Sequence, residues 1–412
     1  MITNKKIYYF TSICIIFCLI SSLRILAQTR ADNNSIEFDR IKKDMLKSDY
    51  INVSLIVASP GKEVYSAAGH AALRMECSSK KIDYCYEFDT DVSISEMIDY
   101  MNGDMNASLY RQFTTSYIKR YKEQGRAITG IKLNLTPIQK ATLWGSLDKE
   151  ADSYRKHGFD FMTNNCSSVA RMFVVGALGD DIIKYNQVDS RLSGTYRETI
   201  PYVFERSPWA QLFWNIMMGT EFDSNPGFES LLFPQALLNE WSKATIISEN
   251  GNERKMVLEK YTLSDLNSAR FSFTPFLLFV IMIIISVAIS LLEFKIGYNF
   301  ISRVWDVILM FIETSVGLFL SYLLIFSHQV ATSWNWLIIV FSPLPLFVWT
   351  LLRNSKLLWK VYLLFSVVLT FYILLTCLIP QMQYGFLSLL LIVFDVRTLY
   401  NLYITNKSSH FY

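Results

Sequence analysis

Cys166 has a sequence context that is typical of a reactive thiol. Two asparagines, Asn164 and Asn165, precede it, and an apolar run, Val169–Leu178, follows it. Because Asn is a favoured N-cap residue, we expect Cys166 to lie in the first turn of a helix. The free N–H groups and partial positive charge of a helix N-terminus stabilise a thiolate, which is the nucleophilic form of cysteine. Without a base nearby, a buried structural cysteine is the better interpretation.

His70 is the candidate for that base among the four histidines of the chain. His328 and His410 lie in or beyond the hydrophobic C-terminal half, and His157 follows Arg and Lys at an expected helix end, where a solvated residue is typical. His70 is flanked by small residues and begins an alternating run of the kind found in strands. Small neighbours allow a second backbone or a substrate to come close. Taken alone, a single histidine is more often a hydrogen-bonded core residue than a catalyst.

A cysteine and a histidine together permit covalent catalysis. His70 would accept the thiol proton, Cys166 would attack a carbonyl carbon, and a thioester would form. Water, an amine or an alcohol would then release the acyl group. The backbone N–H of Cys166 and a neighbouring donor would form the oxyanion hole.

The residues around this pair resemble a known family. Gly69–Arg74 has the pattern Gly-His-small-small-Leu-Arg, and Asn164–Ser168 has the pattern Asp/Asn-Asn-Cys-Ser-Ser/Thr. Further landmarks follow in the expected order at Leu133–Thr136, Ser207–Gly219 and Phe233–Pro234. Over residues 50–244 the chain resembles the bacterial Lnb N-terminal periplasmic domain family. As a fold-level analogy, the order of histidine and helical cysteine is also similar to that of circularly permuted NlpC-type relatives of papain, which include lecithin:retinol acyltransferase.

These resemblances imply further site residues. In permuted papain relatives the residue that orients the imidazole comes from the strand after the histidine. Here that strand contains Glu87 and Asp89, of which Glu87 is our first choice. Arg74, Asn165 and Arg171 belong to the matched elements and are candidate substrate-binding residues. The two arginines either bind an anionic group of the substrate or pair with carboxylates within the fold.

The elements that must position these residues form an α+β pattern, which with the papain analogy gives a papain-like, circularly permuted fold. A helix starts at Thr136–Pro137, with Thr as N-cap and Pro at the first helical position. Cys77 and Cys85 flank a turn, so they form either a disulfide or a pair of small hydrophobic strand residues. Asn250–Asn252 is typical of a hairpin turn between two arms, Ala244–Ile247 and Met256–Tyr261. Expected strands are Ile51–Ala58, His70–Glu76, Ile82–Asp89 and Ala127–Leu135.

Composition excludes several classes of protein. The chain has 412 residues, of which 51% are hydrophobic, which is too many for a purely soluble protein. A net charge of only +3 argues against a nucleic-acid partner. Since neither a phosphate-binding glycine loop nor a zinc ligand set is visible, we expect no cofactor and no metal.

The N-terminus has the pattern of a secretory signal, with Lys5 and Lys6 before the apolar run Ile7–Ile20 and a cleavage site after Ala27. An uncleaved anchor is the alternative.

The C-terminal part has five apolar stretches of about the 20 residues that a bilayer requires. Lys and Arg follow the first, third and fifth stretches and are absent after the second and fourth. The positive-inside rule therefore predicts a multi-pass protein of the bacterial inner membrane, with its N-terminal domain in the periplasm and its C-terminus in the cytoplasm. The stretches are Phe273–Leu292, Val307–Phe326, Trp334–Leu352, Val361–Ile379 and Tyr384–Leu402. The chain then divides into signal, periplasmic domain, hairpin with connector, all-α membrane domain and tail at residues 1–28, 29–244, 245–272, 273–404 and 405–412.

Two acidic residues, Glu313 and Asp395, fall within the apolar stretches. Such groups are costly in lipid and are often functional. The simpler interpretation is that Asp395 pairs with Arg397 and that Glu313 hydrogen-bonds between helices.

We therefore predict a membrane-anchored periplasmic thiol hydrolase or acyltransferase that acts on amide or ester bonds of the cell envelope. Its substrate is either a lipid or lipoprotein acyl group, with membrane lipid as partner, or cell-wall peptide. A non-catalytic maturation or binding module for envelope proteins is the alternative, and a transporter-like protein is a third possibility. Trp209, Phe213 and Trp214 are expected to reach the membrane interface, where Trp is favoured.

Overall fold

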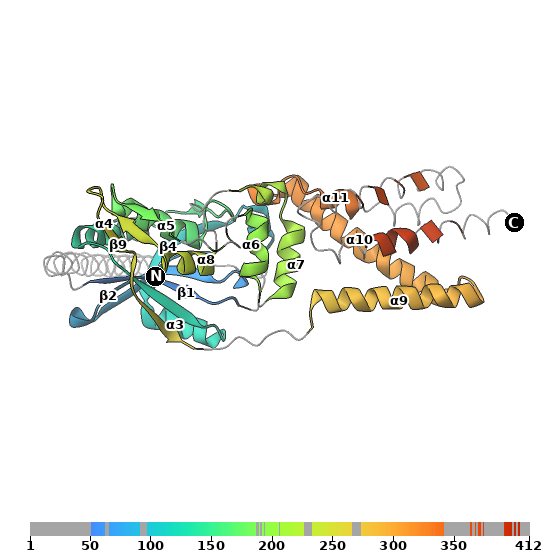
Figure 1. The fold of residues 1–412 in the computed structure, drawn as a ribbon, viewed down its shortest axis with the longest axis horizontal. Helices are drawn as coiled ribbons and strands as arrows, with labels where there is room; N and C mark the ends of the chain where they lie inside the picture. Colours follow the sequence, from blue (N-terminus) through green and yellow to red (C-terminus); the bar gives the residue numbers. More distant parts are fainter. Residues whose placement is uncertain are drawn as a thin grey trace, which may run out of the picture.

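The computed structural model is elongated, with a sheet-rich domain at one end and long helices at the other (Figure 1). It describes residues 51–341 except 62–65, 91–96, 187–188, 190–191, 193, 206, 226–232 and 266–272, and beyond them residues 363–364, 367, 370–371, 374, 391–397, 399–400 and 403. The predicted signal segment, the fourth stretch as a span, most of the third and fifth stretches and the tail lie outside these residues.

A seven-stranded antiparallel sheet organises the first domain, in the order β10-β5-β1-β2-β3-β4-β6. The strands are β1 (Asn52–Ala58), β2 (His70–Cys77), β3 (Ile82–Asp89), β4 (Asn106–Phe113), β5 (Ile128–Leu133), β6 (His157–Gly158) and β10 (Val257–Ser264). β4 and β6 are additional to the strands expected from sequence, whereas β10 overlaps the expected second arm of the hairpin, Met256–Tyr261. β10 pairs with β5 as an edge strand, so the sheet continues beyond the predicted boundary at Ala244. The hairpin partner expected for this segment was wrong, because Thr245–Ile247 pairs with Glu253–Lys255 and β10 pairs with β5.

Helices cover both faces of this sheet. Helices α4 (Pro137–Ser153) and α5 (Cys166–Leu178) pack on one face through Leu143, Trp144 and Val174. On the other face α3 (Thr114–Glu123) buries Tyr117 and Tyr121 against Ala72 and Cys85. The Thr136 N-cap of α4 is present as expected, with Pro137 in the first turn.

Cys77 and Cys85 are both free thiols, so the disulfide alternative is wrong. Cys77 lies opposite Ile82, whereas Cys85 lies opposite Arg74. Because side chains alternate along a strand, the two cysteines point to opposite faces of the sheet.

Shorter elements surround the large sheet. They are α2 (Met97–Asn102), α6 (Tyr196–Val203), α7 (Pro208–Met217), α8 (Pro234–Trp241) and a small sheet of β7 (Ile182–Lys184), β8 (Thr245–Ile247) and β9 (Glu253–Lys255). The expected hairpin at Asn250–Asn252 joins β8 to β9. In Figure 1, α6 and α7 lie between the large sheet and the membrane helices.

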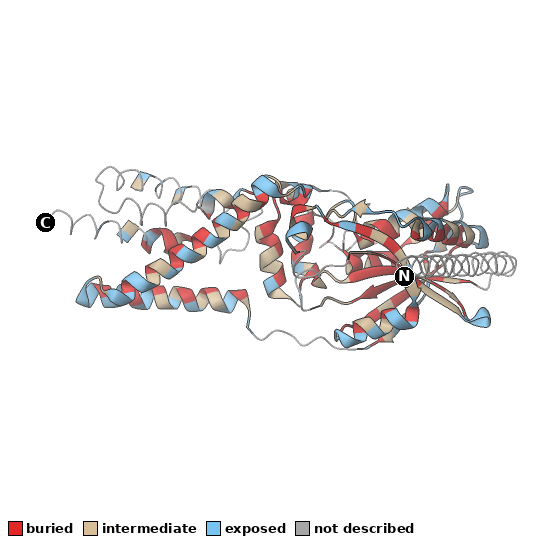
Figure 2. Ribbon diagram, turned by 180° about the vertical axis from the view of Figure 1, so that it is seen from behind, coloured by how far each residue is buried: buried red, intermediate tan, exposed pale blue. Residues whose placement is uncertain are grey.

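Two of the helices in the described residues are long and apolar enough to cross a membrane: α9 (Pro275–Ile296) and α10 (Phe300–Phe326). Many apolar residues of both helices are exposed, and exposed positions recur along both helices in Figure 2. α10 starts seven residues before the expected Val307, because Asn299 caps it by accepting hydrogen bonds from the N–H groups of Ile301 and Ser302. Of the third stretch, the structure describes a short helix, α11 (Leu337–Val340).

Arg397 does not pair with Asp395. Its guanidinium binds Glu293 of α9 and Asp306 of α10, at 2.8 Å each. Asp395 instead accepts a hydrogen bond from Thr370. Residues two apart on a helix point in different directions, so the predicted pair was sterically unfavourable.

The connection after α10 docks directly on the sheet domain. The Ser327 hydroxyl donates to the Met101 carbonyl (2.8 Å), and the His328 N–H donates to the Asn102 carbonyl (2.6 Å). Farther along, Asn335 donates to the Ile216 carbonyl at the end of α7 (2.6 Å). This connection, residues 327–335, therefore fixes the domain to the membrane helices.

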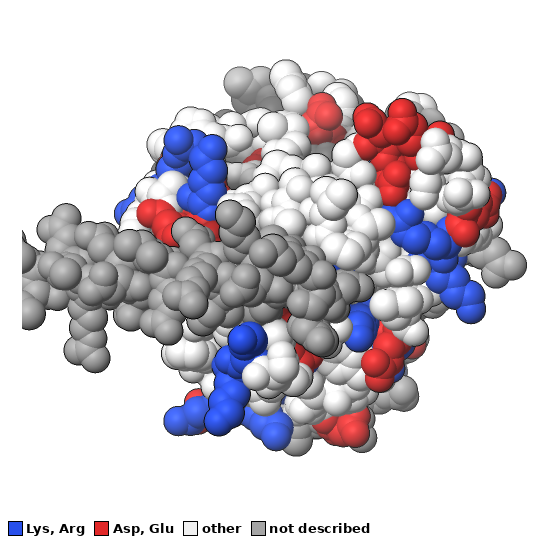
Figure 3. Space-filling view, turned by 90° about the vertical axis from the view of Figure 1, so that its left-hand side faces the viewer, with Lys and Arg blue, Asp and Glu red and all other residues white. Residues whose placement is uncertain are grey.

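At the opposite end of the domain, Lys and Arg side chains are interspersed with Asp and Glu (Figure 3). Neither sign dominates the visible face, in keeping with the small net charge.

Candidate active site

Gly69 places His70 at the end of the sheet. Its φ of +91° lies in the region that favours glycine, and a Cβ atom there would lie 3.0 Å from the Ala58 carbonyl oxygen. His70 then begins β2, opposite Ala58 of β1. Continued by two residues, the β2–β3 register brings His70 opposite Asp89 at the same end of the sheet.

Asn165 places Cys166 at the first position of α5. Its side-chain oxygen accepts hydrogen bonds from the N–H groups of Ser167 (2.9 Å) and Ser168 (3.0 Å), and the Ser168 hydroxyl accepts one from the Asn165 N–H (2.8 Å). The Asn165 amide also donates to the Phe161 carbonyl (2.9 Å). Asn165 lines the pocket described below, but its side chain is used in this capping box, so its evident role is to fix the cysteine.

The Cys166 thiol and the His70 imidazole lie within hydrogen-bonding reach of one another. Burial opposes charge on both groups. For Cys166, the charge and hydrogen bond of His70 and the N–H of Ala71 outweigh burial and lower the thiol pKa. For His70, the Asp89 carboxylate and Cys166 outweigh burial and raise the imidazole pKa to about 10. The pair is therefore suited to a thiolate and an imidazolium.

Two carboxylates face this histidine. Glu87 is fully buried, and its Oε2 lies 3.1 Å from His70 Nε2. The same carboxylate binds the Arg120 guanidinium and the Gln112 amide, which compensate its charge. Asp89 is more open, accepts a hydrogen bond from the Thr90 N–H (2.9 Å), and is the largest influence raising the His70 pKa. The structure thus brings Glu87 to the imidazole as expected, and Asp89 with it.

His70, Glu87 and Asp89 also offer donor atoms within 4.8 Å of one another, as a metal site would. However, Arg120 and Gln112 already occupy the Glu87 oxygens, and His70 also serves the Cys166 thiol. A cation here would compete with a guanidinium for the same carboxylate. The donor set therefore fits orientation of an imidazole better than metal binding.

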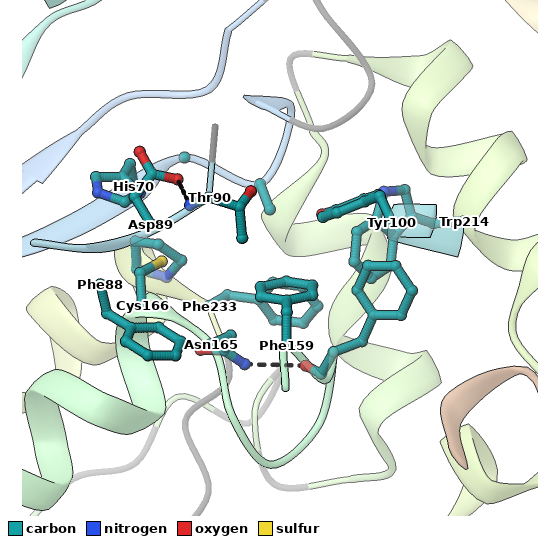
Figure 4. Close-up of a pocket in the computed structure, with 14 residues that line it drawn as sticks. His70, Phe88, Asp89, Thr90, Tyr100, Phe159, Asn165, Cys166, Trp214 and Phe233 are labelled. Carbon is teal, nitrogen blue, oxygen red and sulfur yellow. Dashed lines mark hydrogen bonds between the residues drawn. The ribbon is translucent and has the colours of Figure 1, made fainter. Parts of the chain in front are cut away.

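A cavity of about 90 Å³ opens beside Cys166 and His70 (Figure 4). The polar pair lies on one side, and six aromatic rings form much of the remaining wall, which also contains Ala68, Gly69, Asp89, Thr90, Asn165 and Pro234. The rings come from β3, α2, the segment before α5, α7 and the start of α8: Phe88, Tyr100, Phe159, Phe161, Trp214 and Phe233. Such a wall fits an apolar group attached to the carbonyl under attack.

Trp214 does not reach the membrane interface as expected. It is buried, with 5% of its surface exposed, and lines the cavity. Trp209, five residues earlier on α7, is 36% exposed and stacks on Phe273, which lies just before α9. Phe213, also on α7, packs on Phe319 of α10. α7 therefore lies between the cavity and the membrane helices.

The two arginines of the matched elements lie outside the cavity lining. Arg74 pairs with Asp83 (2.7 Å) and donates to the Tyr261 hydroxyl of β10 (3.3 Å), which supports its carboxylate-pairing alternative. Arg171 lies on α5 five residues after Cys166, a spacing that turns it away from the helix face of the cysteine.

The sequence reading missed Arg120 and most of the aromatic wall. Arg120 lies in a helix whose many basic residues are typical of a solvent-exposed surface. It is 33 residues away in sequence from Glu87, the carboxylate that it binds. The wall is assembled from distant segments, so no local pattern marks it. One signal was available: Phe159 and Phe161 directly precede the cysteine motif at alternate positions.

Comparison with known protein families agrees with this two-part architecture. Residues 37–192 match the Lnb N-terminal periplasmic domain, and residues 267–409 match the Lnb transmembrane domain. No curated protein and no solved structure matches the chain. The protein is thus a membrane protein whose N-terminal domain is periplasmic, and it belongs to the Lnb family.

Proposed function

We propose that this protein is a membrane-bound thiol acyltransferase or hydrolase that acts on acyl groups of membrane lipids or lipoproteins. The observation that carries the proposal is the Cys166–His70 pair at the mouth of an aromatic cavity. α7, which contributes Trp214 to that cavity, packs on the membrane helices through Phe213. A cell-wall peptide is polar and would gain less binding energy from an apolar wall beside the bilayer.

The reaction would proceed in two halves. The Cys166 thiolate attacks the acyl carbonyl carbon, and the His70 imidazolium gives its proton to the departing alcohol or amine, which leaves a thioester on Cys166. Neutral His70 then accepts a proton from water, an alcohol or an amine as it attacks the thioester. The acyl group leaves with the acceptor, and the thiolate–imidazolium pair is restored.

Neighbouring groups would support both halves. The N–H of Cys166 lies at a helix N-terminus, where the first N–H groups have no acceptor within the helix, and it suits an oxyanion. Glu87 and Asp89 would stabilise the imidazolium and hold its ring. The histidine on a strand and the cysteine at a helix start resemble the arrangement of permuted papain-like enzymes.

We further propose that the membrane domain has five spans, with the C-terminus in the cytoplasm. The α9–α10 hairpin supports the first two spans, and the placement of Lys and Arg in the sequence supports the orientation. Docking of residues 327–335 on the periplasmic domain agrees with that connection being periplasmic.

The function can be tested with the full-length protein in lipid vesicles. The vesicles carry a phospholipid with a fluorescent acyl chain, and either a lipopeptide with a free amino terminus or buffer alone is added. Acyl transfer or release that is lost in Cys166→Ser and kept in Cys77→Ser supports the proposal. Cys77 is a matched control because it is buried and the Ser79 hydroxyl, 3.3 Å from its sulfur, can bind a replacement hydroxyl.

Cleavage of muropeptides with no action on the lipid would place the substrate in the cell wall. Activity that survives in Cys166→Ser would mean that Cys166 is not the nucleophile, and no activity on either substrate class would favour the binding-module alternative.

A further inference from the structure

Gln329 belongs to the connection that follows α10, yet its side chain lies inside the periplasmic domain. It is 2% exposed. Its Oε1 accepts a hydrogen bond from the Phe161 N–H (3.0 Å), and its Nε2 donates to the carbonyls of Phe159 (3.2 Å) and Tyr100 (3.4 Å). One amide from the membrane domain thus satisfies three backbone groups of two separate segments.

All three backbone partners belong to residues of the aromatic wall. The Tyr100 ring lies 5.0 Å from that of Phe159 and 5.1 Å from that of Phe161, and Phe161 lies 5.3 Å from Trp214, measured between ring centroids. Because these rings pack on one another, a shift of either backbone segment moves the wall as a unit.

Close packing fixes the amide in turn. Gly103, with φ of +83°, leaves room for it, since a Cβ atom there would lie 3.2 Å from Gln329 Cγ. The other contacts of the connection do not involve the backbone of these wall residues. Ser327 and His328 bind the end of α2, and Asn335 binds the end of α7. The connection would therefore remain docked without the Gln329 amide.

We propose that Gln329 is a positioning residue that shapes the acyl-binding wall of the periplasmic site from the membrane domain. The inference rests on the proposed function, because it assigns the cavity to an apolar chain. It adds that both domains contribute to the site. The periplasmic domain provides the nucleophile, and the membrane domain provides the side chain that holds the wall of the acyl-binding pocket in place.

The test compares two alkylating reagents on the full-length protein in native membranes. The labelling rate with iodoacetamide depends on the reactivity of the Cys166 thiol alone. The rate with N-dodecyl iodoacetamide depends also on how well the pocket accepts the dodecyl chain. Labelling at Cys166 is read by peptide-resolved mass spectrometry, which separates it from the other cysteines. The variants are Gln329→Met, which keeps the length without hydrogen bonds, and Gln329→Glu, which keeps an acceptor for Phe161. The control is Ser333→Ala, because within the part of the chain that the structure describes the Ser333 hydroxyl bonds only the nearby Val330 carbonyl.

Gln329→Met should lower the ratio of dodecyl to small-reagent labelling rates by roughly tenfold, the effect of unmaking buried hydrogen bonds. The pH profile with iodoacetamide should stay unchanged, Gln329→Glu should recover part of the ratio, and Ser333→Ala should match wild type. An unchanged ratio in Gln329→Met overturns the inference. Equal losses with both reagents in both Gln329 variants also overturn it, since they indicate a general loss of folding. Failure of the proposed function is distinct: wild-type Cys166 would then alkylate only as an ordinary thiol.

Discussion

Two buried charge clusters of this protein have similar components, but they differ in whether a proton can move within them. Between the membrane helices, Arg397 binds Glu293, Asp306 and the Ser290 hydroxyl, so its donors and both carboxylates are engaged. At the end of the sheet, two carboxylates also face cationic groups, Arg120 on Glu87 and His70 on both, but His70 can lose its proton to a neighbouring thiolate. The second cluster opens into a cavity. Burial of charge alone therefore does not mark a functional site; a titratable pair beside a cavity does.

The largest expected effect is the loss of acyl turnover when the cluster at the end of the sheet is disrupted. Cys166→Ala and His70→Ala should each lower acyl turnover by at least about 10³-fold, because either change removes a participant in bond making. The fluorescent-lipid assay in vesicles measures this, and thermal unfolding should remain close to wild type for Cys166→Ala, since the Asn165 cap is untouched. Turnover within tenfold of wild type in either variant contradicts the assignment.

The membrane cluster should respond in the opposite way. Arg397→Met leaves Glu293 and Asp306 without their cation, which should reduce the free energy of unfolding by about 3–5 kcal/mol. Thermal unfolding of the full-length protein measures this, with Arg303→Met as the matched control because Arg303 is exposed on α10. Below the unfolding temperature, alkylation of Cys166 should be unchanged. A shifted alkylation profile with unchanged stability would mean that the two clusters are coupled.

A smaller effect should separate the two carboxylates at the site. Asp89→Asn removes the largest influence that raises the His70 pKa, so the imidazolium that supplies the proton to the leaving group is lost at a lower pH. We expect turnover at neutral pH to fall by roughly tenfold to a hundredfold with little change in stability. Glu87→Gln should also lower thermal stability, because Arg120 loses its carboxylate partner. Equal effects of the two variants on stability would contradict this division of roles.

The sequence could predict what is local. The strands around His70 and Glu87 and the capped helix start at Cys166 follow from alternation and N-cap preference, and the two key residues meet because these elements end together. The sequence indicated a strand at Met256–Tyr261, but it could not reveal that β10 pairs with β5 rather than with Ala244–Ile247. Nor could it reveal the partners of Arg397 or Gln329, because these contacts join segments about a hundred or more residues apart and depend on tertiary packing.

The most direct test of the account is the pH dependence of iodoacetamide alkylation at Cys166 in the full-length protein, with a chelator present. The rate follows the thiolate fraction, so a thiol pKa lowered by His70 predicts a midpoint below about 8.5, the value of an ordinary cysteine. In His70→Gln the midpoint should move upward, because the imidazolium is gone and burial then disfavours the thiolate. A wild-type rate that rises only above about pH 8.5, or a profile that is the same in His70→Gln, would contradict the claim that Cys166 and His70 form a reactive pair.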